Sequence, residues 1–489
     1  MKSTHKRLRF LWASLLATAL AGGCGGGSGS QDNTSSSVPV PSIEAITAGG
    51  TIFNASPVSL EAANYSEKEF YVRGTASRYR ISNPMTDAEV IDSGHPYTTR
   101  VVVRAPTDPA KFNGTVVVEW LNVTTGQDVD FVFGATHDLI TREGYAYVGV
   151  TAQRVGAQTL RRWNSTRYGI ISLDAPNVDP KTGTDIDPAG GVGGVQAGGD
   201  VLAWDVMSQI GQALKKGSST LLPGLQVRRV LAAGESQSAV KLERYHNTIH
   251  PLHKVYEGFL LYDRGTQLRA DVGVKVLSVG TEFSATLGGP PQADDADNRW
   301  WEIAGASHVS LAEMTGYIDP STLRDGVFRN GAGTAISLTN VIESGNCATL
   351  PLWSQVPNGP ILSAALSALN TWVGGGQAPA SVPRYVYGSG GVFERGTDNR
   401  VVGGLRTALF DVPRAMNLGT NSGSLFCQFA GSSVNFSDAE MCSRYGSPAN
   451  YLAQFRALTD QNVTDRVMLR PDADRLIAEA SAVTFSCAP

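Results

Sequence analysis

The sequence lacks several features that would assign it to common protein classes. Its formal net charge is only −4, so no excess of positive charge argues for a nucleic-acid partner. It contains no G-x-x-x-x-G-K-[ST] motif, and no strand pattern leads directly into the glycine-rich stretch at 187–199, which excludes a nucleotide-binding loop. The N-terminal apolar run at 11–21 is too short to span a bilayer as a mature helix. We therefore expect a globular protein that binds no nucleic acid.

Histidine is also scarce, with seven residues in a chain of 489. His246, His250 and His253 follow one another at the end of a predicted helix. However, Pro251 interrupts this segment, and no acidic residue completes a metal-binding motif. We interpret the three as surface or capping residues and expect neither a metal nor another cofactor.

The N-terminus has the pattern of an export signal. Basic residues precede the apolar run, and the Ala-Leu-Ala sequence at 19–21 offers a cleavage site. The residues up to Cys24 resemble a bacterial lipobox, although Ala21 stands where a large aliphatic residue is usual. We predict a signal peptide at 1–23 and a Gly/Ser-rich tether at 24–45, and we favour a lipid anchor on Cys24 over plain secretion. In both cases we expect an exported protein, either anchored in the bacterial cell envelope or secreted into the medium. We expect membrane contact only through the lipid anchor.

The other cysteines all lie in the last third of the chain, at Cys347, Cys427, Cys442 and Cys487. Their spacing does not resemble a zinc site. An even number of cysteines in an exported chain predicts two disulfides, and three pairings are open.

The order of apolar segments predicts an α/β fold. The stretches at 69–81 and 97–105 alternate, as antiparallel strands do. Continuous apolar runs, typical of strands buried on both faces, follow at 115–123, 146–151, 258–262 and 274–280, with helical patterns at 129–142 and 200–216. We predict a mostly parallel, doubly wound sheet in a core at 46–310, with a loop-like excursion at 152–199. A C-terminal extension at 311–489 is expected to pack on this core.

The stretch at 227–239, VRRVLAAGESQSA, predicts a strand, a sharp turn and a helix, with Ser236 at the apex. Such a turn exposes the serine above the sheet and directs the N–H of Gln237 toward the atom that the serine attacks. The motif departs from G-x-S-x-G at Ser238, whose small side chain still permits close packing of helix on strand. We expect the second oxyanion donor in the loop after 115–123, with Asn122 as the candidate.

A serine nucleophile needs a general base and a carboxylate that orients the base. His308 follows the last predicted strand, at 300–304, in a loop of small residues, and is the predicted base. Glu282 follows the strand at 274–280, and Asp263 follows the strand at 258–262. We predict Glu282 as the orienting acid and keep Asp263 as the alternative, because both strand ends could reach the imidazole.

With these residues in place, the chain resembles the serine α/β-hydrolases over about 68–310, and more narrowly a family of exported bacterial proteins with an α/β-hydrolase domain. The resemblance rests on the stretches at 116–123 (VVVEWLNV), 204–209 (WDVMSQ), 232–239 (AAGESQSA) and 399–413 (NRVVGGLRTALFDVP), and on the Glu282/His308 pair. It implies an α/β-hydrolase fold with Ser236, Glu282 and His308 as the triad, and little about the substrate. Arg406, in the last stretch, suggests a site for a substrate carboxylate, but we favour a structural role beside a turn.

These residues predict a serine hydrolase that cleaves carboxylic esters through an acyl-enzyme on Ser236. Its expected partner is a small-molecule or oligomeric ester. One alternative is an amidase or peptidase with the same triad. The other is a non-catalytic surface-binding lipoprotein of the same fold, which the presence of both an acid and a base counts against.

Overall fold

The computed structural model describes residues 38–188, 190–192, 195–216, 220–263 and 267–487. The described residues form one compact unit. The predicted signal peptide, Cys24 and most of the predicted tether lie outside the described residues. Among the described helices, none combines the length and apolarity that a membrane span requires.

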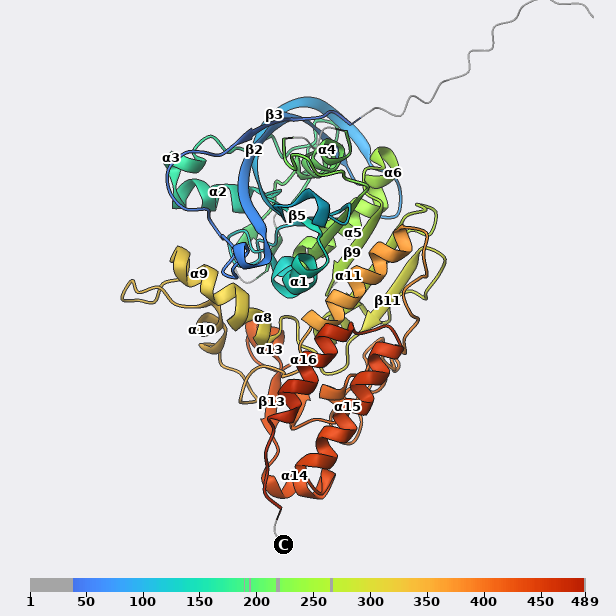
Figure 1. Ribbon diagram of the computed structural model, residues 1–489. Helices are drawn as coiled ribbons and strands as arrows, with labels where there is room; N and C mark the ends of the chain where they lie inside the picture. The colour runs from blue at the N-terminus through green and yellow to red at the C-terminus, as the bar shows by residue number, and fades with distance from the viewer. Residues whose placement is uncertain (1–37, 189, 193–194, 217–219, 264–266, 488–489) are drawn as a thin grey trace, which may run out of the picture. The chain divides into compact units, whose positions relative to one another are not determined.

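A nine-stranded sheet lies at the centre of the compact unit (Figure 1), in the order β1-β2-β3-β5-β4-β8-β9-β10-β11. Antiparallel pairing joins β1, β2, β3 and β5, and from β5 to β11 all pairs are parallel. The strands are β1 (Ser42–Ala45), β2 (Tyr65–Arg80), β3 (Glu89–Pro106), β4 (Thr115–Trp120), β5 (Ala146–Val150), β8 (Arg229–Glu235), β9 (Gly258–Tyr262), β10 (Lys275–Gly280) and β11 (Asn298–Glu302). The predicted mostly parallel sheet is confirmed. Strand β1 lies in the stretch that we assigned to the tether.

Helices cover both faces of the sheet, because side chains of each parallel strand alternate between two cores. Leu231 and Leu260 point to the core shared with α1 (Phe131–Arg142) and α11 (Gly359–Val373). Ala232 and Phe259 point to the opposite core, shared with α4 (Ala203–Lys216) and α5 (Gln237–Thr248). Helix α11 packs on β9 and β10, although it lies within the predicted extension.

The interpretation of the histidines after α5 as surface or capping residues is wrong for two of them. His246 and His250 are buried. Both rings pack edge-on against Phe259, at centroid distances of 5.4 and 5.2 Å. This burial lowers the pKa of His246 to about 4 and that of His250 to about 3.

The remaining elements surround the sheet. The excursion at 152–199 contains α2 (Arg154–Trp163), α3 (Ser165–Tyr168), β6 (Gly190–Val192) and β7 (Val195–Ala197), and is therefore less loop-like than expected. The C-terminal helices α15 (Pro448–Thr464) and α16 (Arg470–Ser481) lie side by side (Figure 1). The others are η1 (Glu61–Ala63), η2 (Pro109–Lys111), α6 (His250–His253), α7 (Glu282–Gly288), α8 (Leu311–Glu313), the π-helix η3 (Met314–Ile318), α9 (Asp319–Asp325), α10 (Leu338–Glu343), α12 (Ala408–Asp411), α13 (Leu425–Ala430) and α14 (Asp438–Tyr445), with the hairpin strands β12 (Ala415–Leu418) and β13 (Ser432–Asn435).

Two disulfides cross-link the C-terminal part of the chain. Cys347 pairs with Cys427, and Cys442 pairs with Cys487. The prediction of two disulfides is confirmed, and the structure selects one of the three pairings. Disulfides form and persist in oxidising compartments, so the protein belongs outside the cytoplasm, in an extracellular or periplasmic setting.

Candidate active site

Ser236 stands at the sharp turn between β8 and α5. Its backbone angles, φ 53° and ψ −117°, are strained for a residue with a side chain, and such strain is typical of a nucleophile held at a tight turn. At Gly234, a Cβ would lie 3.0 Å from Leu242 Cδ1 and 3.1 Å from the Ser238 carbonyl carbon, so a larger residue there would crowd the packing of α5 on β8. The Ser236 N–H donates to the Tyr262 carbonyl at 2.9 Å, which ties the apex to the neighbouring strand.

Ser238 contributes a hydroxyl group where the generic motif has glycine. Its Oγ donates to the Glu235 carbonyl at 2.8 Å and accepts from the Glu235 N–H at 3.1 Å. Ser238 is fully buried. The departure from the motif therefore adds two hydrogen bonds that brace the turn.

His308 joins Ser236 to Asp263. Its Nε2 lies 2.9 Å from Ser236 Oγ, and its Nδ1 contacts Asp263 Oδ2. The imidazole packs against the rings of Phe283 and Phe429, at centroid distances of 4.5 and 4.6 Å, and these two rings also contact each other at 4.8 Å. The ring is thus held by hydrogen-bond partners at both nitrogens and by aromatic contacts, and only 3% of its side chain is exposed.

The prediction of Glu282 as the partner of His308 is wrong; the alternative, Asp263, takes that position. Glu282 Oε1 accepts from the Gly305 N–H at 3.1 Å, and its Oε2 pairs with Arg395 at 2.8 Å. Glu282 therefore braces the loop that carries His308. Both acids follow adjacent parallel strands, so the sequence placed both at the correct edge of the sheet and could not choose between them.

The two predicted oxyanion donors, Gln237 and Asn122, differ in the surroundings of their backbone N–H groups. Gln237 is the first residue of α5, where an N–H has no acceptor within the helix. The Asn122 N–H, the predicted second donor, instead donates to the Val129 carbonyl at 3.0 Å. The hydroxyls of Thr124 and Thr125 are buried without a hydrogen-bond partner among the described residues, and both residues line the pocket.

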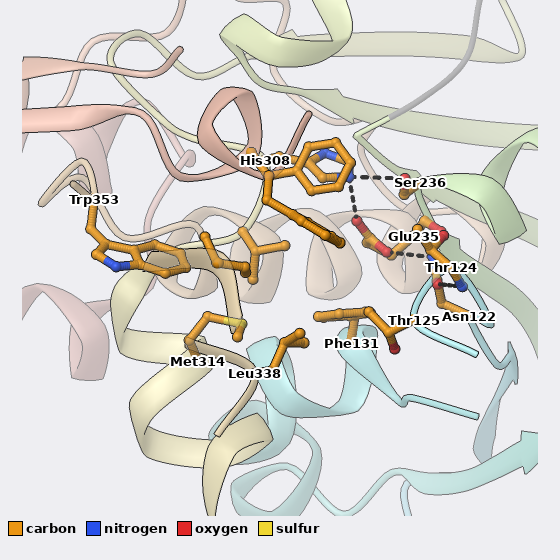
Figure 2. A pocket seen from close by; sticks show the side chains of 14 residues that line it. Asn122, Thr124, Thr125, Phe131, Glu235, Ser236, His308, Met314, Leu338 and Trp353 are labelled. Carbon is orange, nitrogen blue, oxygen red and sulfur yellow. Dashed lines mark hydrogen bonds and ion pairs between the residues drawn. The ribbon is translucent and has the colours of Figure 1, made fainter. Parts of the chain in front are cut away.

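An apolar pocket opens in front of Ser236 and His308 (Figure 2). Its volume is about 30 Å³, room for about two water-sized groups. The C-terminal extension supplies much of its wall, with Met314, Leu338, Ile342, Trp353, Phe426 and Phe429. No described residue of the excursion at 152–199 lines this pocket.

Arg406 lies away from this pocket. Its guanidinium pairs with Asp411 and stacks on Phe410, at 4.6 Å from the ring centroid. The preceding Gly403 and Gly404 have φ of 84° and 78°, as a turn requires. The structural interpretation of Arg406 is the one that fits.

Carboxyl groups other than Asp263 also lie near the histidine, and none of them was predicted from the sequence. Glu235 Oε1 lies 3.2 Å from His308 Nε2, and Glu313 Oε2 accepts from the Ser310 N–H at 3.1 Å. Burial raises the pKa of Glu313 to about 7 and that of Glu235 well above its usual range. The one available signal was the position of Glu235, a charged residue at the end of an otherwise apolar strand.

A family model described as "Alpha/beta hydrolase domain" matches residues 36–478. The chain belongs to this α/β-hydrolase family. The match includes most of the C-terminal extension that builds the pocket of this α/β-hydrolase. No curated protein matches the sequence.

Solved structures similar to this α/β-hydrolase share little sequence with it. They include a glucuronoyl esterase from Solibacter usitatus (9% identity, 50% of this chain and 68% of that chain, TM-score 0.28). A second is acetyl xylan esterase 1 from Thermoanaerobacterium (14% identity, 45% and 52%, TM-score 0.25). A third is a serine hydrolase without a lid from Xanthomonas campestris (11% identity, 48% and 85%, TM-score 0.26). The chain spans about half the length of the acetyl xylan esterases that it matches.

Proposed function

We propose that this α/β-hydrolase cleaves carboxylic esters through an acyl-enzyme on Ser236. The observation that carries the proposal is the contact series Ser236–His308–Asp263 at the base of an apolar pocket. A hydroxyl, an imidazole and a carboxylate in this order are the groups that activate a serine. The substrate is proposed to be a small or oligomeric ester.

In the proposed acylation step, Ser236 Oγ forms a bond to the acyl carbon, and its proton passes to His308 Nε2. Asp263 holds the imidazole through Nδ1 and stabilises the imidazolium. The oxyanion receives hydrogen bonds from the Gln237 N–H and from the Thr124 or Thr125 hydroxyl. The bond between the acyl carbon and the alcohol oxygen then breaks, and the proton on Nε2 leaves with the alcohol.

Three measurements test the proposal on a chain lacking residues 1–37. The wild-type protein is expected to hydrolyse p-nitrophenyl acetate and to be labelled by a fluorophosphonate probe. Ser236→Ala is expected to lose both the activity and the labelling. Activity that survives in Ser236→Ala would refute the mechanism. A wild type without labelling would favour the non-catalytic alternative, and faster turnover of p-nitroanilides than of esters would favour the amidase.

We further propose that Cys24 carries a lipid anchor, followed by the Gly/Ser-rich tether. Support comes from the lipobox-like sequence and from the oxidising compartment that the disulfides indicate. Metabolic labelling with a palmitate analogue is expected to tag the full-length protein but not Cys24→Ser. Equal labelling of the wild type and of Cys24→Ser would contradict a lipid anchor on Cys24.

A further inference from the structure

Glu235 is a buried acid at the site to which the Ser236–His308–Asp263 series gives no role. It lines the pocket and is 1% exposed. Asn122 Nδ2 donates to Glu235 Oε2 at 2.8 Å and to the Glu235 carbonyl at 3.0 Å. The Asn122 amide thus fixes one carboxyl oxygen and leaves the other, Oε1, beside His308 (Figure 2).

Glu235 Oε1 has no hydrogen-bond partner among the described residues, although it lies 3.2 Å from His308 Nε2. The same Nε2 lies 2.9 Å from Ser236 Oγ. A buried polar atom without a partner is costly and calls for an explanation. Its position beside the nitrogen that takes and returns the proton suggests that a reacting molecule is the missing partner.

The surroundings of Glu235 favour its neutral form. The carboxyl groups of Asp263, Glu313 and Glu119 approach it from three different elements, and no Lys or Arg is among the described residues that line the pocket. Burial and these neighbours raise the pKa of Glu235 well above its usual range. Because Oε2 is held as an acceptor by Asn122, the proton belongs on Oε1, which then presents an O–H donor next to His308.

We propose that Glu235 positions the water that hydrolyses the acyl-enzyme, holding the water oxygen within hydrogen-bond distance of both its own Oε1 and His308 Nε2. This inference rests on the proposed function. In the step, the water oxygen forms a bond to the acyl carbon, and one water proton passes to Nε2. The bond between the acyl carbon and Ser236 Oγ then breaks, the proton on Nε2 returns to Oγ, and the carboxylic acid departs. Glu235 donates one hydrogen bond to the water throughout and exchanges no proton.

The positioning role of Glu235 belongs to deacylation, because the nucleophile of that step is a water molecule, which is held differently from Ser236, the nucleophile of acylation. Ser236 is fixed covalently in the turn, and His308 already contacts its Oγ. A water molecule has no such tether, so a second hydrogen bond supplies the orientation that the chain supplies for the serine. Loss of Glu235 is therefore expected to slow deacylation far more than acylation.

The test uses stopped-flow bursts with p-nitrophenyl acetate, which separate the acylation and deacylation rate constants. Glu235→Met, apolar and of similar length, is expected to slow deacylation by about tenfold or more and acylation by less than about threefold. Acetyl-Ser236 should then accumulate in intact-protein mass spectra. In Glu235→Gln, Asn122 selects the amide oxygen, so the amide nitrogen takes the place of Oε1. This variant keeps a donor there and should deacylate within about threefold of wild type.

Glu313→Gln is the matched control, since it removes another buried carboxyl near His308 that does not line the pocket. It is expected to change acylation and deacylation by the same factor. Proportional loss of both steps in Glu235→Met would overturn the proposal, as would unchanged deacylation. Fluorophosphonate labelling of each variant confirms that Ser236 still reacts. Failure of the proposed function looks different, because the wild type would then neither hydrolyse p-nitrophenyl acetate nor be labelled by the fluorophosphonate probe.

Discussion

The Thr281 N–H donates to Asp263 Oδ1 at 2.6 Å, which leaves Asp263 Oδ2 to face His308. This contact fixes the carboxylate that orients the proposed base. Asp263→Asn is expected to lower kcat for p-nitrophenyl acetate by about 10³–10⁴-fold, because an amide can support the wrong imidazole tautomer and cannot stabilise the imidazolium.

Glu282→Gln is the matched comparison for Asp263→Asn. The substitution keeps an oxygen near the Gly305 N–H but weakens the pair with Arg395. We expect kcat to fall by less than about tenfold, because Glu282 acts only through the His308 loop. A larger loss in Glu282→Gln than in Asp263→Asn would reverse the assignment of the two acids.

The sequence predicted most of the parallel sheet, because strands buried on both faces leave continuous apolar runs. It also predicted Ser236 and His308 at strand ends from local pattern, and the structure brings their side chains to 2.9 Å from each other. It did not distinguish Asp263 from Glu282, because that choice depends on the side-chain directions set by Thr281 and by Arg395, far along the chain. Among the pocket residues, Trp353 lies in an irregular segment and Phe429 on the six-residue helix α13, and neither offers enough periodicity to predict which side chain faces the serine.

Trp353 closes the pocket at the end opposite to Ser236 (Figure 2). Its indole N–H donates to Glu343 at 2.9 Å, and its residue exposure is only 2%. Because the pocket is small, wild type is expected to favour acetyl over octanoyl esters. Trp353→Ala removes most of the side chain and should shift the ratio of kcat/KM toward octanoate by about tenfold or more.

Trp372→Ala is the control for the tryptophan substitution. Trp372 lies on α11, outside the pocket, where Lys275 and Arg299 stack on its ring. Trp372→Ala should lower the free energy of unfolding without changing the ratio of kcat/KM between octanoyl and acetyl esters. An equal shift of this ratio in Trp353→Ala and Trp372→Ala would mean that Trp353 does not limit the length of the acyl group that the pocket accepts.

The Cys347–Cys427 disulfide joins two segments that form the pocket wall. Cys427 lies on α13 between Phe426 and Phe429, and Cys347 follows α10, which carries Leu338 and Ile342. The Cys442–Cys487 disulfide joins residues that do not line the pocket. Both disulfides close long loops of the chain, but only Cys347–Cys427 joins segments that form the pocket wall.

Replacing either cystine by serines is expected to lower the free energy of unfolding by a similar amount, on the order of 4 kcal/mol by loop entropy, for sequence separations of 80 and 45 residues. The catalytic effects should differ. At a temperature where both variants are folded, the Cys347/Cys427 variant should lose kcat/KM by about tenfold, because its aromatic wall is no longer fixed. The Cys442/Cys487 variant should retain the kcat/KM of the wild type. Equal losses of kcat/KM in the two variants would contradict a role of the Cys347–Cys427 disulfide in fixing the pocket wall.

Glu313 gives the folded protein a distinct dependence on pH. Its pKa is raised by burial from 4.5 to about 7, so the folded state binds this proton more tightly than the unfolded chain does. The stabilising contribution is therefore complete below about pH 4.5 and is lost as the pH rises to about 7. Within this window, each pH unit can remove at most about 1.4 kcal/mol.

Glu313→Gln cannot lose a proton and keeps an oxygen acceptor for the Ser310 N–H and the Tyr262 hydroxyl. Relative to wild type, this variant should therefore gain stability as the pH rises from 5 to 7, and the difference should level off above about pH 7.5. Urea denaturation at intervals of half a pH unit measures the difference directly. A difference that is constant across this range would mean that Glu313 is already ionised at pH 5 in the folded state. The carboxyl groups near His308 would then carry more negative charge than their burial favours. The neutral form assigned to Glu235 would no longer be supported by a second buried carboxyl group that stays protonated.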